Sequence, residues 1–216
     1  MKQNVWEQEY RNVDSLWGFN PNNILSQYVD MLPESGKVLD IGIGEGRNAL
    51  FFAKRGFAVE GIDISETAVE RCLEFSKEHN LNVKATVQDL TSFEIEPNKY
   101  SLIILSNVLN FFPDNDIKII IEKVKNGLLK NGLVYISAFD DKEPGRKKAP
   151  EKYEQLAEHT FYNERLHMFL HYFTRSELEG FFADYKMISL SQSYSLDISH
   201  GQPHYHSTLE IMSQKP

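Results

Sequence analysis

Residues 38–48, VLDIGIGEGRN, combine the residue types and the spacing that a ligand-binding loop requires. A short apolar run delivers Asp40, and a tight turn into a helical segment follows, with glycine at positions 42, 44 and 46. Glycine lets the backbone of such a turn approach a ligand closely, and the start of the next helix exposes backbone amides. The segment therefore predicts a binding site at the end of the first strand.

The same segment also indicates which kind of ligand binds there. A dinucleotide fingerprint, GxGxxG, would have its third glycine at position 47, where this chain has Arg47. The carboxylate of Asp40 lies two residues before Gly42, where it would repel a pyrophosphate and attract a cationic amino group. S-adenosylmethionine carries a sulfonium and an ammonium group and no phosphate, so its chemistry fits this loop better than that of a nicotinamide cofactor.

Two further acids end the next expected strands. Asp63, in GIDIS, is placed to accept hydrogen bonds from both ribose hydroxyls. Asp89, in VQDL, is placed to accept from an adenine amino group while the amide of Leu90 faces a ring nitrogen. Asp40 could also simply cap its loop, and Asp63 could cap the helix at Ser65. Three acids at consecutive strand ends nevertheless favour one ligand site, because open sheets bind ligands at the carboxyl ends of their strands.

The elements that must position these residues follow from hydrophobic periodicity. From position 37 onward, short apolar runs alternate with helical periods, which predicts an α/β fold with a mainly parallel sheet and helices on both faces. The last two strands are joined without a helix, so one of about seven strands should be reversed near the sheet edge. The expected strands cover residues 37–41, 57–62, 83–87, 100–105 and 133–138, with two more near 185–191 and 205–212.

Capping residues predict where the helices begin. Asn20, with Pro21 at the first helical position, should start the first helix, which Pro33 and Gly36 end. The other expected caps are Ser65, Asp114, and Thr174 in a capping box with Glu177. The helix after Ser65 should bury a stripe of Ala68, Val69, Cys72, Leu73 and Ser76.

The chain reads as one domain in four parts. Residues 1–36 form a helical cap, 37–138 the cofactor-binding core, 139–173 a loop-like lid or insertion rich in charge and proline, and 174–216 a last helix with two strands. The length of 216 residues, 41% hydrophobic and 25% charged, fits one soluble globular domain.

Composition also restricts location and partners. The net charge of −8 argues against nucleic acid as a partner. A single cysteine, Cys72, permits no internal disulfide and favours a reducing compartment. No apolar run approaches the ~20 residues of a membrane-spanning helix, and the first residues lack a signal-peptide pattern. We therefore expect a cytoplasmic protein with no membrane partner, and the sequence leaves its oligomeric state open.

Four motifs in order, VLDIGIGEG, VEGIDIS, VQDL and YSLIILSNVLNFFPD, make residues 37–138 resemble the core of a class I S-adenosylmethionine-dependent methyltransferase. The stretch GEGRNALFFAKRGFAVEGIDIS further resembles the small bacterial branch that includes the tellurite-resistance methyltransferases. The resemblance implies a Rossmann-like three-layer sandwich, and in-line methyl transfer from S-adenosylmethionine to a small molecule, with S-adenosylhomocysteine as product. The cofactor-binding residues that it implies are Tyr10, Asp40, Gly42, Ile43, Gly44, Asn48, Asp63, Ile64, Asp89, Leu90 and Leu105.

Two positions depart from the family pattern. Ile43 stands where many relatives have cysteine, which should be harmless because the backbone makes the contact. Leu105 stands where the tellurite-resistance branch usually has serine, which leaves the methyl acceptor open.

Substrate and catalytic residues are less clearly marked. Trp17, Asn107 and Asn110 are the substrate candidates, whereas Trp6 and Phe19 fit better as packing residues, and His167 and His171 as residues at the edge of the core. Displacement at a sulfonium mainly requires positioning and exclusion of water, so a base is optional and no triad is expected.

Two histidines near the carboxyl end of the chain are the catalytic candidates. His204 and His206 lie two residues apart, on one face of a strand, and could serve as base or anion binder. His200 precedes them in the expected loop. No third ligand stands at a recognised spacing, so the sequence predicts no metal.

Three other functions stay open at this point. An NAD-dependent oxidoreductase is disfavoured by Arg47 and Asp40. A noncatalytic S-adenosylmethionine-binding regulatory protein would share every motif above. Methylation of RNA or protein is disfavoured by the acidic charge and by SNVLNF, where an NPPY-like sequence would stand.

Overall fold

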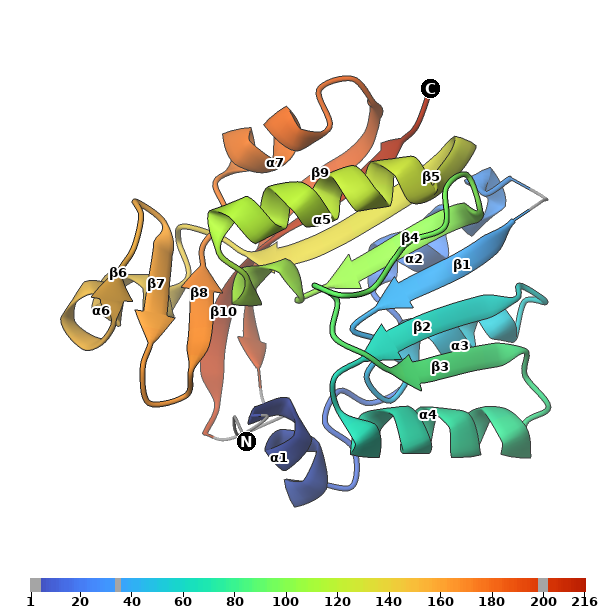
Figure 1. Cartoon of the computed structure of the whole chain (residues 1–216), viewed down its shortest axis with the longest axis horizontal. Helices are drawn as coiled ribbons and strands as arrows, with labels where there is room; N and C mark the ends of the chain where they lie inside the picture. The colour runs from blue at the N-terminus through green and yellow to red at the C-terminus, as the bar shows by residue number, and fades with distance from the viewer. Residues whose placement is uncertain (1–4, 34–35, 198–201) are drawn as a thin grey trace.

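The core of the protein is a seven-stranded sheet with the order β3-β2-β1-β4-β5-β10-β9 (Figure 1). It is seen in a computed structural model that describes residues 5–33, 36–197 and 202–216. Strand β10 runs antiparallel to both β5 and β9, and the other neighbouring pairs are parallel, so the predicted single reversed strand next to the edge is confirmed. The strands are β1 (Lys37–Ile41), β2 (Val59–Asp63), β3 (Val83–Val87), β4 (Tyr100–Ser106), β5 (Leu128–Phe139), β9 (Lys186–Asp197) and β10 (His204–Gln214).

Helices pack on both faces of this sheet and complete the predicted three layers. Alternate residues of a strand face opposite sides, so Leu39 and Ile103 join one hydrophobic cluster and Val38 and Leu102 the other. The first cluster contains residues of α5 (Asp114–Gly127) and α7 (Arg175–Phe181). The second contains residues of α2 (Asn23–Gln27), α3 (Arg47–Ala53) and α4 (Glu66–Glu78).

Two of the four predicted caps are confirmed, and the other two helix starts are not as predicted. Ser65 accepts from the amide of Ala68 at 3.2 Å, and Thr174 accepts from the amide of Glu177 at 3.1 Å. The helix expected from Asn20 begins only at Asn23 and ends after five residues, followed by the 3-10 turn η1 (Val29–Met31). The backbone amide of Asn22 donates to Asn48 Oδ1 at 3.0 Å, which holds the preceding segment out of the helix.

Asp114 and Leu73 also differ from expectation. Asp114 is the first residue of α5 rather than its cap, and its carboxylate accepts from the hydroxyl of Thr160. Leu73 is 37% exposed, so the buried stripe of α4 consists of Ala68, Val69, Cys72 and Ser76.

Residues 139–173 are built from regular elements rather than from a loop. Helix α6 (Pro144–Lys152) is followed by an antiparallel sheet of β6 (Glu154–Gln155), β7 (Thr160–Asn163) and β8 (Met168–His171). A small cluster of Ala149, Phe161 and Tyr172 fixes this unit. Its strands are too short, at two to four residues, to give a periodic signal, and they are ordered by pairing with one another.

Within the helical cap expected at residues 1–36, the structure has a further helix, α1 (Val5–Asn12), before the predicted first helix. The carboxylate of Glu7 accepts from the Ser65 hydroxyl at 2.7 Å and from the Thr67 amide at 3.1 Å, which ties α1 to the start of α4. Figure 1 shows the arrowheads of β1, β2 and β4 directed towards the side where α1 and the small sheet lie. In the described part of the chain, no helix is long and apolar enough to cross a membrane.

Candidate functional site

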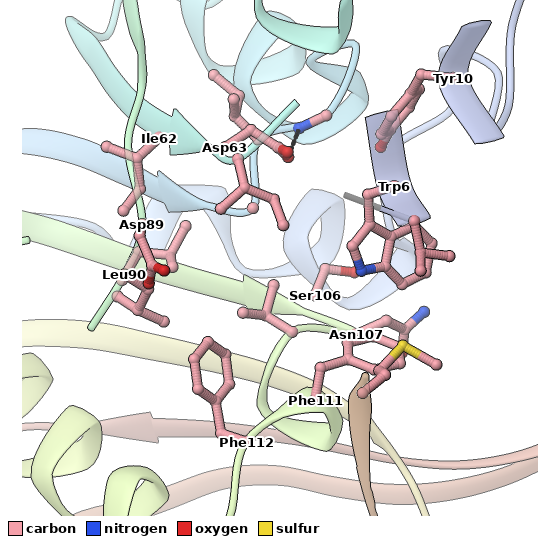
Figure 2. Close-up of a pocket in the computed structure, with 18 of the residues that line it drawn as sticks. Trp6, Tyr10, Ile62, Asp63, Asp89, Leu90, Ser106, Asn107, Phe111 and Phe112 are labelled. Carbon is pink, nitrogen blue, oxygen red and sulfur yellow. Dashed lines mark hydrogen bonds between the residues drawn. The ribbon is translucent and has the colours of Figure 1, made fainter. Parts of the chain in front are cut away.

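A cavity of about 760 Å³ opens at the carboxyl ends of the parallel strands, within the range of small-molecule sites. Its wall combines the glycine loop after β1, the ends of β2, β3 and β4, helix α1 and the turn that precedes β8. The open sheet thus places its cavity where the strand-end acids of the sequence predict it. Figure 2 shows the acids on one side and aromatic side chains on the other.

The glycine loop needs glycine because of its backbone and its neighbours. Gly42, Gly44 and Gly46 have φ angles of 71°, 54° and 90°, in the left-handed region that side chains disfavour. A Cβ added at Gly44 would lie 2.5 Å from the hydroxyl of Tyr10, and one at Gly42 would lie 2.4 Å from a methyl of Val108. The absence of side chains therefore lets Tyr10 close directly over the loop.

Tyr10 is buried in this position. Burial, together with the charge of the nearby Asp63, raises the pKa of its phenol, so the hydroxyl keeps its proton as a hydrogen-bond donor. The guanidinium of Arg71 holds the segment in place, donating to the carbonyl oxygens of Tyr10 and Val13 and to Glu45 Oε1 at 3.0 Å.

Asp63 bonds two backbone amides at the edge of the cavity. Its Oδ2 accepts from the amide of Gly44 at 2.9 Å (Figure 2). Its Oδ1 accepts from the amide of Ser65 at 2.9 Å. It therefore fastens the glycine loop to the start of α4, and it also lines the cavity. A carboxylate oxygen has more than one acceptor site, so these bonds leave capacity for ligand hydroxyls.

Asp89 and Leu90 lie along the same side of the cavity as Asp63 (Figure 2). Asp89 Oδ1 accepts from the amide of Thr91 at 2.8 Å, which fixes the carboxylate at the strand end. The adenine-binding role given to Asp89 and Leu90 stays a prediction, and this placement is compatible with it.

Asp40 lies beneath the glycine loop and is not part of the cavity wall. Its side chain is 2% exposed, whereas its successors Ile41, Gly42 and Ile43 line the cavity. Burial raises the pKa of the Asp40 carboxyl to about 8, against the opposing effects of Arg47 and of the backbone amide of Ala49. The ligand contact expected of Asp40 stays a prediction, and its carboxylate is not among the groups that line the cavity.

The raised pKa of Asp40 predicts how stability changes with pH. An unfolded aspartate loses its proton near pH ~4, whereas the folded protein holds it up to about pH 8, so the free energy of unfolding falls as pH rises between these values. Asparagine has no such titration. The melting temperature of Asp40→Asn relative to the parent should therefore rise from pH 5 to pH 8 and then level off. Asp30→Asn, at an exposed position, is the control, and a difference independent of pH would contradict the assignment.

An aromatic wall faces the acids across the cavity. The rings of Trp6 and Phe111 meet edge to face with centroids 4.9 Å apart, and Phe112, Phe139 and Phe169 continue the surface. The sequence assigned Trp6 to packing and did not predict the phenylalanines, because they come from segments that are far apart in the chain. Phe111 and Phe112 follow β4, Phe139 ends β5, and Phe169 lies in β8.

Two further polar residues of the cavity wall lie at the end of β4. Ser106 lines the cavity and accepts from the guanidinium of Arg47 at 3.1 Å, next to Asn107. Leu105, the residue predicted here, is fully buried in the core, because neighbouring strand residues face opposite sides.

Several predicted residues do line the cavity. They are Tyr10, Gly42, Ile43, Gly44, Asn48, Asp63, Ile64, Asp89 and Leu90 among the cofactor candidates, and Trp17 and Asn107 among the substrate candidates. Their ligand contacts remain predictions. His167 also lines the cavity, although it was expected at the core edge, whereas His171 is buried.

Three other candidates lie elsewhere. Asn110 is fully buried and bonds the backbone of Phe139 and the carbonyl of His171, at 2.7 Å, so it joins η2 (Leu109–Phe111) to β5 and β8. His204 and His206 do not line the cavity. The ring of His206 stacks on Phe139, which does line it. In the sheet, β10 lies beyond β5 from the glycine loop. His200 falls outside the described residues.

Known proteins resemble this chain in sequence and in fold. A family model for a methyltransferase domain matches residues 38–132. A probable S-adenosyl-L-methionine-dependent methyltransferase, TehB of Haemophilus influenzae, is 32% identical over 89 residues, which cover 41% of this chain and 31% of the relative. The 2-heptyl-1-hydroxyquinolin-4(1H)-one methyltransferase of Mycobacteroides abscessus is 34% identical over 79 residues, covering 36% and 35%. The matched region thus spans about a third of each relative.

Solved structures show the same fold over nearly the whole chain. The crystal structure of TehB from Haemophilus influenzae has a TM-score of 0.72 at 19% identity and covers 98% of this chain and 67% of that one. An S-adenosylmethionine-dependent methyltransferase from Methanosarcina mazei has a TM-score of 0.72 at 20% identity, covering 91% and 98%.

The fold and the sequence matches point to the same class of proteins. Residues 38–132 match the methyltransferase-domain model, and nearly the whole chain has the fold of solved S-adenosylmethionine-dependent methyltransferases. In sequence and in fold the chain is similar to TehB. S-adenosylmethionine is the cofactor named for these relatives, and the glycine loop with its adjoining acids is the part of the cavity where the sequence predicts that it binds.

Proposed function

We propose that the protein transfers the methyl group of S-adenosylmethionine to a small aromatic acceptor. The observation that carries this proposal is one cavity with two chemically different sides, the glycine loop and its acids on one and the aromatic wall on the other. A planar acceptor stacked on Trp6 and Phe111 would face a cofactor held over Gly44. This arrangement can hold donor and acceptor in near-attack geometry and exclude water.

The chemistry requires little from the protein beyond positioning. A lone pair of the acceptor forms a bond to the methyl carbon while the carbon–sulfur bond breaks, and its electrons stay on sulfur to give S-adenosylhomocysteine. An acceptor that is already anionic needs no base. For a neutral hydroxyl acceptor, the proton would pass to solvent or to His167, the histidine in the cavity wall.

The name of one relative supports an aromatic acceptor. The Mycobacteroides abscessus enzyme, 34% identical over 79 residues, is named for a hydroxyquinolinone. Because the matched region spans 35% of that enzyme, its substrate indicates a class to test and not the acceptor itself.

We infer a cytoplasmic location from the acidic composition and the single cysteine, which cell fractionation would test.

A screen for release of S-adenosylhomocysteine tests the function. The acceptor panel should contain hydroxyquinolines and phenols beside tellurite, selenite, thiols and small carboxylates. We expect turnover of a hydroxylated heteroaromatic compound. Binding of S-adenosylmethionine without turnover of any compound would favour the regulatory protein, and binding of NADH in its place would favour the oxidoreductase. Turnover of tellurite alone would overturn the aromatic acceptor but keep the methyltransferase.

Phe111→Ala tests the aromatic wall specifically. Loss of a ring contact should raise KM for an aromatic acceptor about tenfold, corresponding to ~1.4 kcal/mol. The dissociation constant of S-adenosylmethionine should change little, since the cofactor is proposed to lie over the glycine loop. Steady-state kinetics with calorimetry measures both quantities. Phe19→Ala is the matched control, because Phe19 stacks on Phe75 and is not in the cavity wall. An unchanged KM in Phe111→Ala would remove this ring from acceptor binding.

A further inference from the structure

Three side chains converge on one face of the β9–β10 pair, outside the methyltransferase cavity. Asp197 is the direct cross-strand partner of His204, and His206 follows two residues later on the same strand. Directly opposed residues, and residues two apart on a strand, project to the same side of a sheet. The antiparallel pairing thus supplies the carboxylate that no spacing in the sequence indicated.

The donor atoms of these side chains lie close enough to share one ion. His204 Nε2 is 2.9 Å from His206 Nε2, and His206 Nε2 is 3.7 Å from Asp197 Oδ2. Taking one ligand atom from each of the three residues, all three atoms lie within 4.8 Å of one another. Donor atoms at roughly 2.0–2.1 Å from a tetrahedral zinc ion are about 3.3 Å apart, so modest adjustments complete the geometry.

Both imidazole rings are oriented as metal-binding histidines usually are. His204 Nδ1 lies 2.8 Å from the carbonyl oxygen of Gln202, and His206 Nδ1 lies 3.0 Å from Glu143 Oε1. Such acceptors hold the proton on Nδ1 and leave Nε2 to bind a metal ion. The carboxylate of Glu143 is itself fixed by the amide of Ser207 at 2.7 Å.

We propose that Asp197, His204 and His206 form a binding site for a divalent transition-metal ion of the zinc class. Two imidazoles with one carboxylate favour zinc, nickel or cobalt over magnesium and calcium, which prefer oxygen ligands. Glu143 and the Gln202 carbonyl orient the ligands.

A metal ion at this site would act on the fold and only indirectly on the cavity. It would cross-link β9 and β10 beside the end of β5, and it would fix the ring of His206, which stacks on Phe139 with centroids 4.8 Å apart. Phe139 is part of the aromatic wall. The proposal is independent of methyl transfer, because neither histidine lines the cavity.

Calorimetric titration with zinc tests the site on the whole chain without a histidine tag. We expect one ion per chain, bound at micromolar protein concentration, and at least tenfold weaker binding in each of His204→Gln, His206→Gln and Asp197→Asn. His79→Gln is the matched control and should bind as the parent does, because His79 is exposed and stacks on Phe75. Absence of zinc binding by the parent, or binding that the three ligand variants leave unchanged, would overturn the proposal.

Two further measurements separate coordination from effects on folding. Cobalt bound by the parent should give visible absorption bands of a four-coordinate site, which the ligand variants should lose while their circular dichroism stays that of the parent. Glu143→Gln should retain the bands and bind more weakly than the parent, as expected of an orienting residue. Zinc should raise the melting temperature of the parent and of His79→Gln but not of the ligand variants. Cobalt bands or zinc stabilisation retained in all three ligand variants would place the ion elsewhere.

Discussion

Gly44→Val should abolish binding of S-adenosylmethionine. The φ angle of 54° at this position is strained for a β-branched residue, and the new Cβ would lie 2.5 Å from the hydroxyl of Tyr10. Tyr10 is buried, and Arg71 donates a hydrogen bond to its carbonyl oxygen. Either the tyrosine or the glycine loop must therefore move. We expect at least a 100-fold loss of affinity, ~2.7 kcal/mol, measured by calorimetry with S-adenosylmethionine or S-adenosylhomocysteine.

Gly56→Val separates this effect from backbone strain. Gly56 has a φ angle of 89°, no atom within 4 Å of an added Cβ, and no place in the cavity wall. Strain of roughly 1–2 kcal/mol should lower the melting temperature of either variant by a few degrees. Only Gly44→Val should lose the cofactor. If a folded Gly44→Val protein bound as tightly as the parent, the ligand would have to lie elsewhere.

Asp63→Ala should weaken both the cofactor and the fold. The sequence alone predicts lost ligand bonds with little change in stability. The structure adds that the amides of Gly44 and Ser65 would lose their acceptor, at about 1–3 kcal/mol for each buried donor. We expect a 10- to 100-fold loss of S-adenosylmethionine affinity by calorimetry and a melting temperature several degrees lower.

Two companion variants make the Asp63 result specific. Asp63→Asn keeps one carbonyl oxygen as an acceptor, so it should fall between the parent and Asp63→Ala in both measurements. Asp30→Ala, at an exposed position, should match the parent. An Asp63→Ala protein with the parent's dissociation constant would show that this carboxylate does not touch the cofactor.

Features that depend on neighbouring residues in the chain were predictable. The alternation of strands and helices determined the α/β class and the reversed strand. The glycine turn and the acids Asp63 and Asp89 were placed correctly at the cavity, because a strand end followed by a turn fixes a residue's position locally. Ser65 and Thr174 cap their helices by accepting from the amide three residues later in the chain, and these contacts are equally local.

Features that depend on strand orientation and on distant partners were not predictable. Whether Leu105 or Ser106 faces the cavity depends on the pleat of β4 against its neighbours. Asp40 is enclosed by the packing of the loop above it, although its spacing from Gly42 suggested contact with the ligand. The small sheet of β6, β7 and β8 gave no periodic signal, since its residues gain order only from one another.

The sequence by itself thus determined the fold class, the glycine loop and the chemistry of the cofactor side. Only the tertiary structure gathered Trp6, Phe111 and Phe139, which are far apart in the chain, into one wall, and brought Asp197 beside His204. The physical reason is the range of the interactions. Turns, caps and strand ends are fixed by bonds over a few residues, whereas a wall or a ligand set depends on where chain segments meet in space.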